Sequence, residues 1–382
     1  MKMFVCTSFT QNIVTVLWML SSLDLGVAGI SIIEVPLTKI RSNYYGYIKV
    51  GTPLEEGGED QIFRVNFDTG SQHLWLITTE GCKNPDCKGE KFTPYDRTKS
   101  KTYTKVDVRP FSLSYSDGTK VNGHLGSDVL KIGVEGKRAE FTQVIGLASS
   151  AKGVFRDYDG IFGLGLLTES LFPGEESPDP PMYTMNKLYD IGEFSIYFSR
   201  IFNGDGAGKI LFGGYDTELA MEPMHWHNVV SFDGDYHGYN IRLKKLIVET
   251  GGEKREIEFK NMLALPDSGC NVITGPFEQF DKLRNEIYSH ATFEYSTTDK
   301  RSFNCKEDVS TLPNIVFVMD DKEYKMEPRD YIWVFSSGNL CSVGIYGMET
   351  DHIVLGQVFM QAFYTHFNIE EKKVGFARAN HS

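Results

Sequence analysis

Two stretches decide the fold: Phe67-Asp68-Thr69-Gly70-Ser71 and its diverged copy Pro266-Asp267-Ser268-Gly269-Cys270. Each follows a strand-like apolar run, and the two aspartates lie 267 − 68 = 199 positions apart. That spacing is about the length of one domain. Each stretch is followed later by two apolar residues and a glycine, at Ile161-Phe162-Gly163 and at Val354-Leu355-Gly356. The sequence therefore predicts two related halves with an approximate twofold axis, which brings both aspartate loops into the cleft between two lobes.

The paired aspartates carry a specific chemistry. Two carboxylates about 3 Å apart cannot both ionise at low cost, so one keeps a proton while the other is charged. Such a pair provides an acid and a base around one water molecule, and it titrates as a unit. Gly70 and Gly269 let the backbone come close and offer N–H groups to the carboxylates. We expect the hydroxyls of Thr69 and Ser268 to donate to the opposite loop and to keep the halves in register.

Length and composition agree with two packed lobes. The chain has 382 residues, of which 41% are hydrophobic and 24% charged. This is more than one core of ordinary size accommodates. The formal net charge of −12 excludes a basic footprint for nucleic acid, so we predict no nucleic-acid partner.

Most of the chain is strand-like. Runs at 111–115, 241–248 and 314–318 have the composition of strands, and turn residues separate them. The clearest helix lies between Phe277 and His290, where apolar residues recur three or four positions apart behind Gly-Pro. These patterns predict an all-β protein with few helices.

The N-terminus resembles an export signal. Lys2 precedes a short apolar run at 13–20, and small residues follow at 26–29. We predict a signal peptide at 1–28, the alternative being a buried first helix or strand. No other segment has the length of a membrane span. The expected location is the secretory pathway, with a secreted, lysosomal or digestive destination.

Cysteine usage fits an oxidising compartment. Cys82 and Cys87 close a short loop, which we interpret as a local disulfide rather than half of a metal site. Cys305 and Cys341 are the other candidates for pairing, which leaves Cys270 as a free thiol. We expect no metal and no cofactor, and we interpret His225 and His227 as surface residues.

From about residue 44 to 380 the sequence resembles the pepsin family of aspartic proteases. One Asp-Thr-Gly alone is weak evidence, whereas two such motifs with the accompanying segments in the same order are specific. The matching segments are Tyr44-Tyr-Gly-Tyr-Ile-Lys-Val-Gly-Thr-Pro53, Asp68-Thr-Gly-Ser-Gln-His-Leu-Trp75, Tyr115-Ser-Asp-Gly-Thr119, Tyr158-Asp-Gly-Ile-Phe-Gly-Leu-Gly165, Leu211-Phe-Gly-Gly214, Val354-Leu-Gly-Gln-Val-Phe359 and Lys373-Val-Gly-Phe376.

The resemblance implies an all-β, bilobed pepsin-like fold of two pseudo-twofold-related, barrel-like lobes. It implies a monomeric aspartic endopeptidase, with Asp68 and Asp267 activating water for attack on a peptide bound as an extended strand. Tyr115 is expected on a flap over the substrate, with its hydroxyl directed toward Trp75. The predicted substrate-binding residues are Gly70, Tyr115, Ser116, Asp117, Gly269, Cys270 and Asn66, and the supporting residues are Thr69, Ser71, Trp75 and Ser268.

Four positions depart from the family pattern or vary it. Cys270 replaces a Ser or Thr, and a thiol is the weaker hydrogen-bond donor, so we expect Asp267 to be held less firmly. Asn66 replaces an apolar pocket residue, which predicts altered preference beside the scissile bond. Pro266 removes a strand N–H just before Asp267. Ser268 in place of Thr keeps the hydroxyl.

The segment before the first lobe is short. Residues 33–42 resemble the opening of the family's basic pro-segment, yet they lead directly into the strand at Tyr44. Residues 29–43 are therefore either a truncated pro-segment or a first strand, and Lys39 or Arg41 is a candidate partner of the aspartates. We predict an N-terminal lobe at 44–205 and a C-terminal lobe at 206–382. The alternative to an active zymogen-derived enzyme is a catalytically weakened peptide-binding protein.

Overall fold

The structure, a computed structural model, describes residues 32–40, 42–81, 92–116, 118–152, 158–167, 178–201, 203–297, 301–335 and 338–382. Four sequence-based predictions fall outside the described residues: the signal peptide at 1–28, the Cys82–Cys87 disulfide, the role of Asp117 and that of Arg41.

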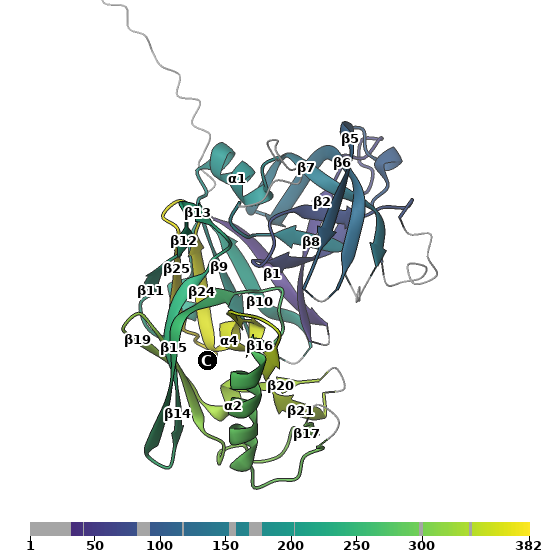
Figure 1. Cartoon of the computed structure of the whole chain (residues 1–382). Coiled ribbons are helices and arrows are strands. Elements are labelled where there is room, and N and C mark those ends of the chain that lie inside the picture. The colour runs from purple at the N-terminus through teal and green to yellow at the C-terminus, as the bar shows by residue number, and fades with distance from the viewer. Residues whose placement is uncertain are drawn as a thin grey trace, which may run out of the picture.

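The chain folds as two β-rich lobes with a sheet between them (Figure 1). This confirms the predicted all-β, bilobed architecture. The upper lobe in Figure 1 is built from β2 (Asn43–Val50), β3 (Ile62–Asp68), β4 (Leu74–Ile77), β5 (Thr104–Ser114), β6 (Lys120–Val134), β7 (Lys137–Lys152) and β8 (Gly160–Gly163). Because β2 pairs with β6 as well as with β3, the sheet of this lobe closes on itself.

The lower lobe contains β14 (Ile241–Thr250), β15 (Glu253–Pro266), β16 (Ile273–Pro276), β18 (Asn314–Met319), β19 (Lys322–Met326), β22 (Ile345–Met348) and β23 (Ile353–Leu355). Two smaller elements complete the strands of the second half that lie outside the central sheet. One is a sheet of β17 (Phe303–Asn304), β20 (Ile332–Val334) and β21 (Leu340–Val343), and the other is a hairpin of β12 (Ser231–Phe232) and β13 (Asp235–Tyr236).

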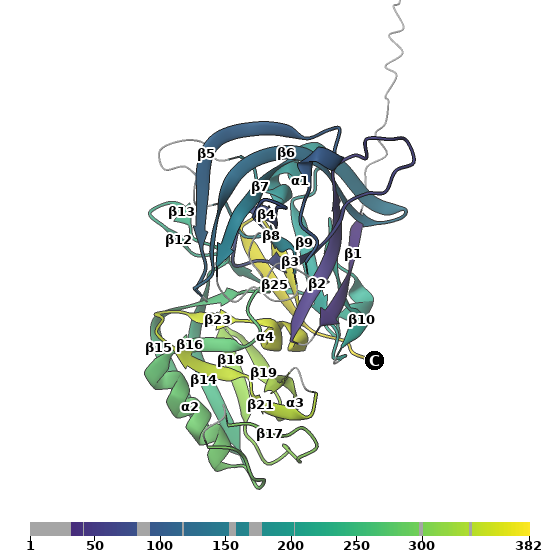
Figure 2. The same ribbon diagram turned by 90° about the vertical axis from the view of Figure 1, so that its right-hand side faces the viewer.

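Both halves contribute to the central sheet. Its strands are β1 (Ile33–Ile40), β9 (Glu193–Phe198), β10 (Gly204–Phe212), β11 (His225–Asn228), β24 (Phe363–Asn368) and β25 (Lys373–Arg378). Figure 2 shows β1 beside β2 and β10, where this sheet joins the upper lobe. The described helices are α1 (Pro181–Tyr189), α2 (Phe277–Ser289), α3 (Pro328–Tyr331) and α4 (Gln357–Ala362).

The internal repeat of the sequence is present in the strand pairing. In the first half β3 runs parallel to β8, while β4 pairs antiparallel with β8 and parallel with β7. In the second half β15, β23, β16 and β22 repeat these three pairings in the same directions. Each aspartate loop therefore leaves a strand that lies beside the later strand carrying the apolar-apolar-Gly pattern.

Residues 33–40 form the strand β1, which is paired on both sides. β1 pairs along its length with β10, and at its end with β2. Ile33, Val35 and Leu37 alternate into the core and are at most 2% exposed, and burying an aliphatic side chain of this size is worth about 1.5–3 kcal/mol.

Helix α2 matches the predicted periodicity over nearly its whole length. Phe280, Leu283 and Ile287 are buried, whereas Phe277, the first helical residue, is 61% exposed. The helix packs beside β22 and β16 of the lower lobe.

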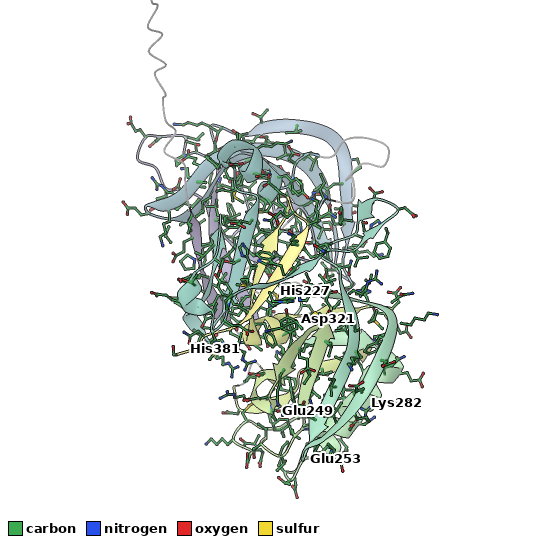
Figure 3. The ribbon with its side chains drawn as sticks, turned by 90° about the vertical axis from the view of Figure 1, so that its left-hand side faces the viewer. His227, Glu249, Glu253, Lys282, Asp321 and His381 are labelled. Carbon is green, nitrogen blue, oxygen red and sulfur yellow. A yellow bond between two sulfur atoms is a disulfide. The ribbon has the colours of Figure 1, made fainter. Side chains whose placement is uncertain are left out.

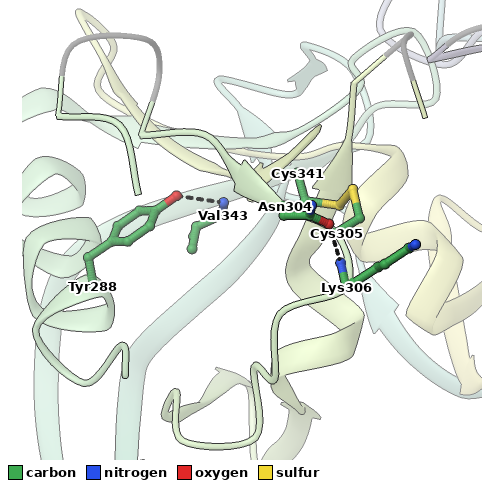
Figure 4. Close-up of a disulfide and its surroundings, with 6 residues drawn as sticks. All are labelled: Tyr288, Asn304, Cys305, Lys306, Cys341 and Val343. Atoms are coloured by element: carbon green, nitrogen blue, oxygen red, sulfur yellow. Dashed lines mark hydrogen bonds between the residues drawn. A yellow bond between two sulfur atoms is a disulfide. The ribbon is translucent and has the colours of Figure 1, made fainter. Parts of the chain in front are cut away.

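The disulfide joins Cys305 to Cys341 and ties the turn after β17 to β21 (Figure 4). In the same region the hydroxyl of Tyr288 on α2 accepts the Val343 N–H at 3.0 Å. Cys270 is the free cysteine among the described residues.

The interpretation of both strand histidines as surface residues is wrong for His227. Its side chain is 1% exposed, with Nδ1 2.7 Å from an Asp320 carboxylate oxygen and Nε2 2.7 Å from the Tyr324 hydroxyl. It lies at the junction of the central sheet and the lower lobe, near Asp321 (Figure 3). Alternation along β11 turns His225 and His227 to the same face, and the β18–β19 hairpin covers only the second of them.

Candidate active site

The two aspartate loops meet at the junction of the lobes. Asp68 ends β3, and Asp267 follows β15 directly. Each carboxylate lies over the glycine of the opposite loop. A Cβ atom built on Gly70 would be 2.8 Å from the carboxyl carbon of Asp267, and one on Gly269 would be 2.8 Å from that of Asp68. Only glycine permits this approach, so the structure brings the predicted pair together.

Two hydroxyls hold the loops in register. The Thr69 hydroxyl donates to the Pro266 carbonyl at 2.9 Å and accepts the Ser268 N–H at 2.9 Å. The Ser268 hydroxyl donates to the Phe67 carbonyl at 2.7 Å and accepts the Thr69 N–H at 3.0 Å. We call these four reciprocal bonds the hydroxyl clasp. Thr69 and Ser268 are at most 1% exposed, so the clasp satisfies buried backbone groups that water does not reach.

The carboxylates differ in their donors. Asp68 accepts the Gly70 N–H at 2.9 Å and the Ser71 hydroxyl at 2.5 Å. Asp267 accepts the equivalent backbone donor, the Gly269 N–H, at 2.8 Å. The Cys270 thiol, which stands where the first loop has Ser71, donates instead to the Val272 carbonyl at 3.3 Å.

Electrostatics separates the two acids. Burial, followed by the nearby charge of Asp68 and a hydrogen bond with it, holds the pKa of Asp267 well above its usual value. The N–H groups of Gly269 and Cys270 oppose this rise without cancelling it. Burial also raises the pKa of the Cys270 thiol to about 12, so this cysteine stays protonated and is a poor nucleophile. The pair can therefore hold one proton between its two carboxylates.

Backbone packing supports each loop from behind. The N–H groups of Leu164 and Gly165 donate to the carbonyls of Asp68 and Ser71 at 2.8 and 2.7 Å. In the second half Gln357 N–H donates to the Cys270 carbonyl at 2.7 Å. A side chain on Gly163 or Gly356 would collide with the backbone of the loop in front of it. This explains the glycine that ends both apolar patterns.

The flap residues form a second group in the upper lobe. β5 and β6 are joined by a tight turn in which Gly118 N–H donates to the Tyr115 carbonyl at 3.0 Å. The Trp75 indole N–H donates to the Tyr115 hydroxyl at 2.7 Å. Trp75 lies on β4 and is fully buried, while Ser116 at the turn is exposed. The hairpin tip is thereby tied to the strand that follows the Asp68 loop.

The remaining predicted positions are explained by local geometry. Asn66 is 8% exposed on β3, two residues before Asp68, so its side chain faces the same side of the sheet as the carboxylate. Pro266 disrupts no ladder bond. Asp267 N–H donates to the Leu355 carbonyl at 3.1 Å, and β14, which would receive an N–H from position 266, begins at Ile241 opposite Ala264.

The site contains two polar residues that the sequence analysis did not select, Asn271 and Gln357. The Asn271 amide nitrogen lies within hydrogen-bond distance of the Ser42 carbonyl, Asn43 and Gln357. Gln357 in turn donates to the Ser268 carbonyl at 2.8 Å. A signal was present: Gln357 follows the second apolar-apolar-Gly pattern at the position where the first half has the apolar Leu164.

Over the part of the chain that the structure describes, no three His, Cys, Asp or Glu side chains are arranged to hold a metal ion. No helix among the same residues has the length and apolarity needed to cross a membrane.

Comparison with known proteins assigns the family. Residues 43–379 match the family described as eukaryotic aspartyl protease. Cathepsin E of Mus musculus is 29% identical, the alignment covering 91% of this chain and 83% of that protein. Embryonic pepsinogen of Gallus gallus is 28% identical with the same two coverages, and cathepsin D of Mus musculus is 27% identical over 88% of this chain and 81% of its own length. The chain belongs to the eukaryotic aspartyl protease family, whose members are aspartic-type endopeptidases.

Proposed function

We propose that this chain is an acid endopeptidase that hydrolyses peptide bonds of extended polypeptides through a water molecule held between Asp68 and Asp267. The observation that carries the proposal is the placement of each carboxylate over the opposite glycine, with one proton favoured on Asp267. No side chain forms a covalent intermediate in this scheme.

The proposed reaction has two steps. Ionised Asp68 accepts a proton from the water as its oxygen bonds to the carbonyl carbon, while Asp267 gives its proton to the carbonyl oxygen. In the second step the proton on Asp68 passes to the amide nitrogen, the C–N bond breaks, and Asp267 recovers its proton from the hydroxyl. Atoms and charge balance, and the enzyme returns to its starting state. Acid–base assistance of this kind contributes about 10²–10⁴-fold.

The substrate is proposed to lie as an added strand between the loops and the flap. Backbone groups of Gly70, Gly269 and Ser116 supply the sequence-independent contacts, and Tyr115 covers the peptide. Asn66 and Cys270 border the reacting bond and set preference there. The lobes that enclose the peptide are proposed to be 44–205 and 206–382, with the strand β10 crossing their boundary in the shared sheet.

The test compares Asp68→Asn and Asp267→Asn with wild type and with Asp308→Asn, which alters a carboxylate in an exposed turn of the second half. Cleavage of denatured haemoglobin and of a quenched peptide is measured between about pH 3 and pH 5. Each dyad variant should lose about 10⁴-fold in kcat/KM, while the Asp308 variant retains wild-type activity. Activity that survives in Asp68→Asn would refute the assigned dyad. A wild-type protein that binds a statine-type peptide but cleaves neither substrate would establish the peptide-binding alternative.

We also propose that residues 1–28 direct the chain into the secretory pathway. N-terminal sequencing of protein recovered from a eukaryotic culture medium tests this. A mature chain that still begins at Met1, or protein retained in the cytosol, would contradict it.

A further inference from the structure

Ser42 and Asn43, which lie where β2 begins, contact the loop that carries Asp267. We call these two residues the β1–β2 turn. The Asn271 side-chain nitrogen lies 2.6 Å from the Ser42 carbonyl, 2.9 Å from Asn43 Oδ1 and 3.0 Å from Gln357 Oε1. All three partners are oxygen acceptors, which fixes the orientation of this amide. A side chain four residues after Asp267 is thus bound to a turn 229 positions away in the sequence.

Gln357 extends this contact into the hydroxyl clasp. Its side chain is 3% exposed, and both ends of its amide are engaged. Oε1 accepts from Asn271, and Nε2 donates to the Ser268 carbonyl at 2.8 Å. Gln357 therefore connects Asn271 to the residue whose hydroxyl holds the opposite loop.

Helix α4, which begins at Gln357, also contacts the start of β2. Gln361 on this helix donates to the Tyr44 hydroxyl and, at 3.0 Å, to the Ser199 carbonyl. Tyr44 itself donates to the same Ser199 carbonyl at 3.1 Å. Since α4 also supports the Asp267 loop through the Gln357 N–H, the helix joins this loop to the β1–β2 hairpin at two points.

We propose that the β1–β2 turn positions the Asp267 loop through Asn271 and Gln357, and that residues 42–43 consequently remain part of the working enzyme. The inference rests on the proposed function for its catalytic consequence. Asn271 and Gln357 act here as positioning residues, because they touch Ser268 and the loop backbone rather than the carboxylates. Removing the turn contact should let Asp267 drift relative to Asp68, and displacements of about 1 Å can cost 10²-fold in rate.

The experiment is a double-mutant cycle in the full chain with Asn43→Ala, Asn271→Ala and both together. Asn285→Ala is the matched control, because this asparagine donates to Asp281 on the exposed face of α2. We expect Asn271→Ala to lower kcat about tenfold with KM within about twofold. Because Asn43→Ala removes one acceptor of the same amide, the double variant should be no worse than Asn271→Ala alone. If the losses in kcat of the two single variants multiply in the double variant, the proposal is overturned.

Hydrogen exchange provides a readout that does not need activity. Amides in the segment 262–272 should exchange faster in Asn43→Ala and Asn271→Ala than in wild type. Their exchange rates should be unchanged in Asn285→Ala. If Asn43→Ala and Asn271→Ala both exchange at the wild-type rate, the inference is refuted even if the protein cleaves no substrate. Cleavage by wild type together with unaltered kcat in the variants refutes it while leaving the proposed function intact.

Intact-mass analysis of the acid-activated enzyme completes the test. We expect the active species to retain residues 42–43. An active form that begins beyond Asn43 would overturn the proposal directly.

Discussion

In the loop after β3 the Ser71 hydroxyl donates to Asp68 at 2.5 Å, whereas in the loop after β15 the Cys270 thiol donates to the Val272 carbonyl at 3.3 Å. Apart from the Asn271 and Gln357 side-chain contacts of the second loop, the contacts that place the two carboxylates are nearly interchangeable. Both carboxylates accept a glycine N–H two residues on, and both loops exchange the same pair of hydroxyl bonds. The backbone of the site is therefore symmetric, and its electrostatics is not.

This difference shows how a duplicated loop acquires two roles. Backbone N–H groups and the clasp hydroxyls place the carboxylates, and these features are shared. The residue three positions after each aspartate decides whether a side-chain donor reaches that carboxylate, since Ser71 supplies one and Cys270 does not. The Ser71 hydroxyl donates to Asp68, whereas the Cys270 thiol donates away from Asp267; burial, followed by the nearby charge of Asp68, favours the neutral form of Asp267.

Among variants that keep Asp68 and Asp267, the largest predicted effect comes from breaking the symmetric part. Thr69→Ala removes one bond to the Pro266 carbonyl and one to the Ser268 N–H, and Ser268→Ala removes the equivalent two bonds. Each variant leaves two buried polar groups unpaired, so the free energy of unfolding should fall by about 3 kcal/mol. We also expect kcat to fall about 10²-fold, because the loops lose their register.

Urea unfolding and steady-state kinetics measure these losses. Thr69→Ser and Ser268→Thr are the controls, because they keep both hydroxyl bonds and should stay near wild type. A loss confined to one of the two alanine variants would contradict the reciprocity of the clasp.

The second prediction concerns the pH dependence of stability. The folded-state pKa of Asp267 is raised, so its contribution to stability is fully present below the ordinary Asp range and is lost as pH rises toward the raised value. Wild type should therefore lose stability relative to Asp267→Asn by about 1.4 kcal/mol for each pH unit in which only the folded protein keeps this proton. Denaturant unfolding of both proteins at several pH values from about 4 upward measures the difference.

His73 does not affect this comparison. Burial lowers the pKa of His73 to about 4, which removes stability as the pH falls below the ordinary histidine range. The same effect operates in wild type and in Asp267→Asn, so it leaves their difference unchanged. A difference that stays flat with pH would show that Asp267 is ionised in the folded protein at all these pH values.

The sequence identified the parts of the site that depend on local motifs. Asp68, Asp267, their glycines and the clasp hydroxyls occupy motif positions, and a buried strand before each motif makes their placement predictable. Helix α2 followed from apolar spacing in the same way. The pairing of β1 with β10 remained open, because a strand pattern does not specify its partner.

Two of the features that sequence reasoning missed depend on tertiary contacts over long separations, and a third is local. Asn271 binds a turn 229 residues away, and His227 is buried by a hairpin 93 residues away. The direction of the Cys270 thiol is a rotamer choice among nearby acceptors, which residue identity alone does not fix. The Asn271 and His227 contacts form only in the folded chain, whereas the Cys270 thiol contacts a carbonyl two residues away.

The smallest predicted effects come from exchanging the asymmetric donors. Ser71→Ala removes the hydroxyl bond to the Asp68 carboxylate, so kcat/KM should fall by about tenfold. Cys270→Ala should lie within about twofold of wild type, because the thiol gives nothing to Asp267. The measurement is the pH profile of kcat/KM with the quenched peptide.

Cys270→Ser tests the comparison in the opposite direction. A hydroxyl that turns to the Asp267 carboxylate favours its ionised form and lowers its pKa. Because the protonated form is then lost at a lower pH, the alkaline limb of the profile should shift down by up to about one pH unit. An unchanged alkaline limb would mean that the serine, like the thiol, donates to the Val272 carbonyl. In that case the path of the loop backbone, rather than the donor strength of residue 270, would be the source of the asymmetry.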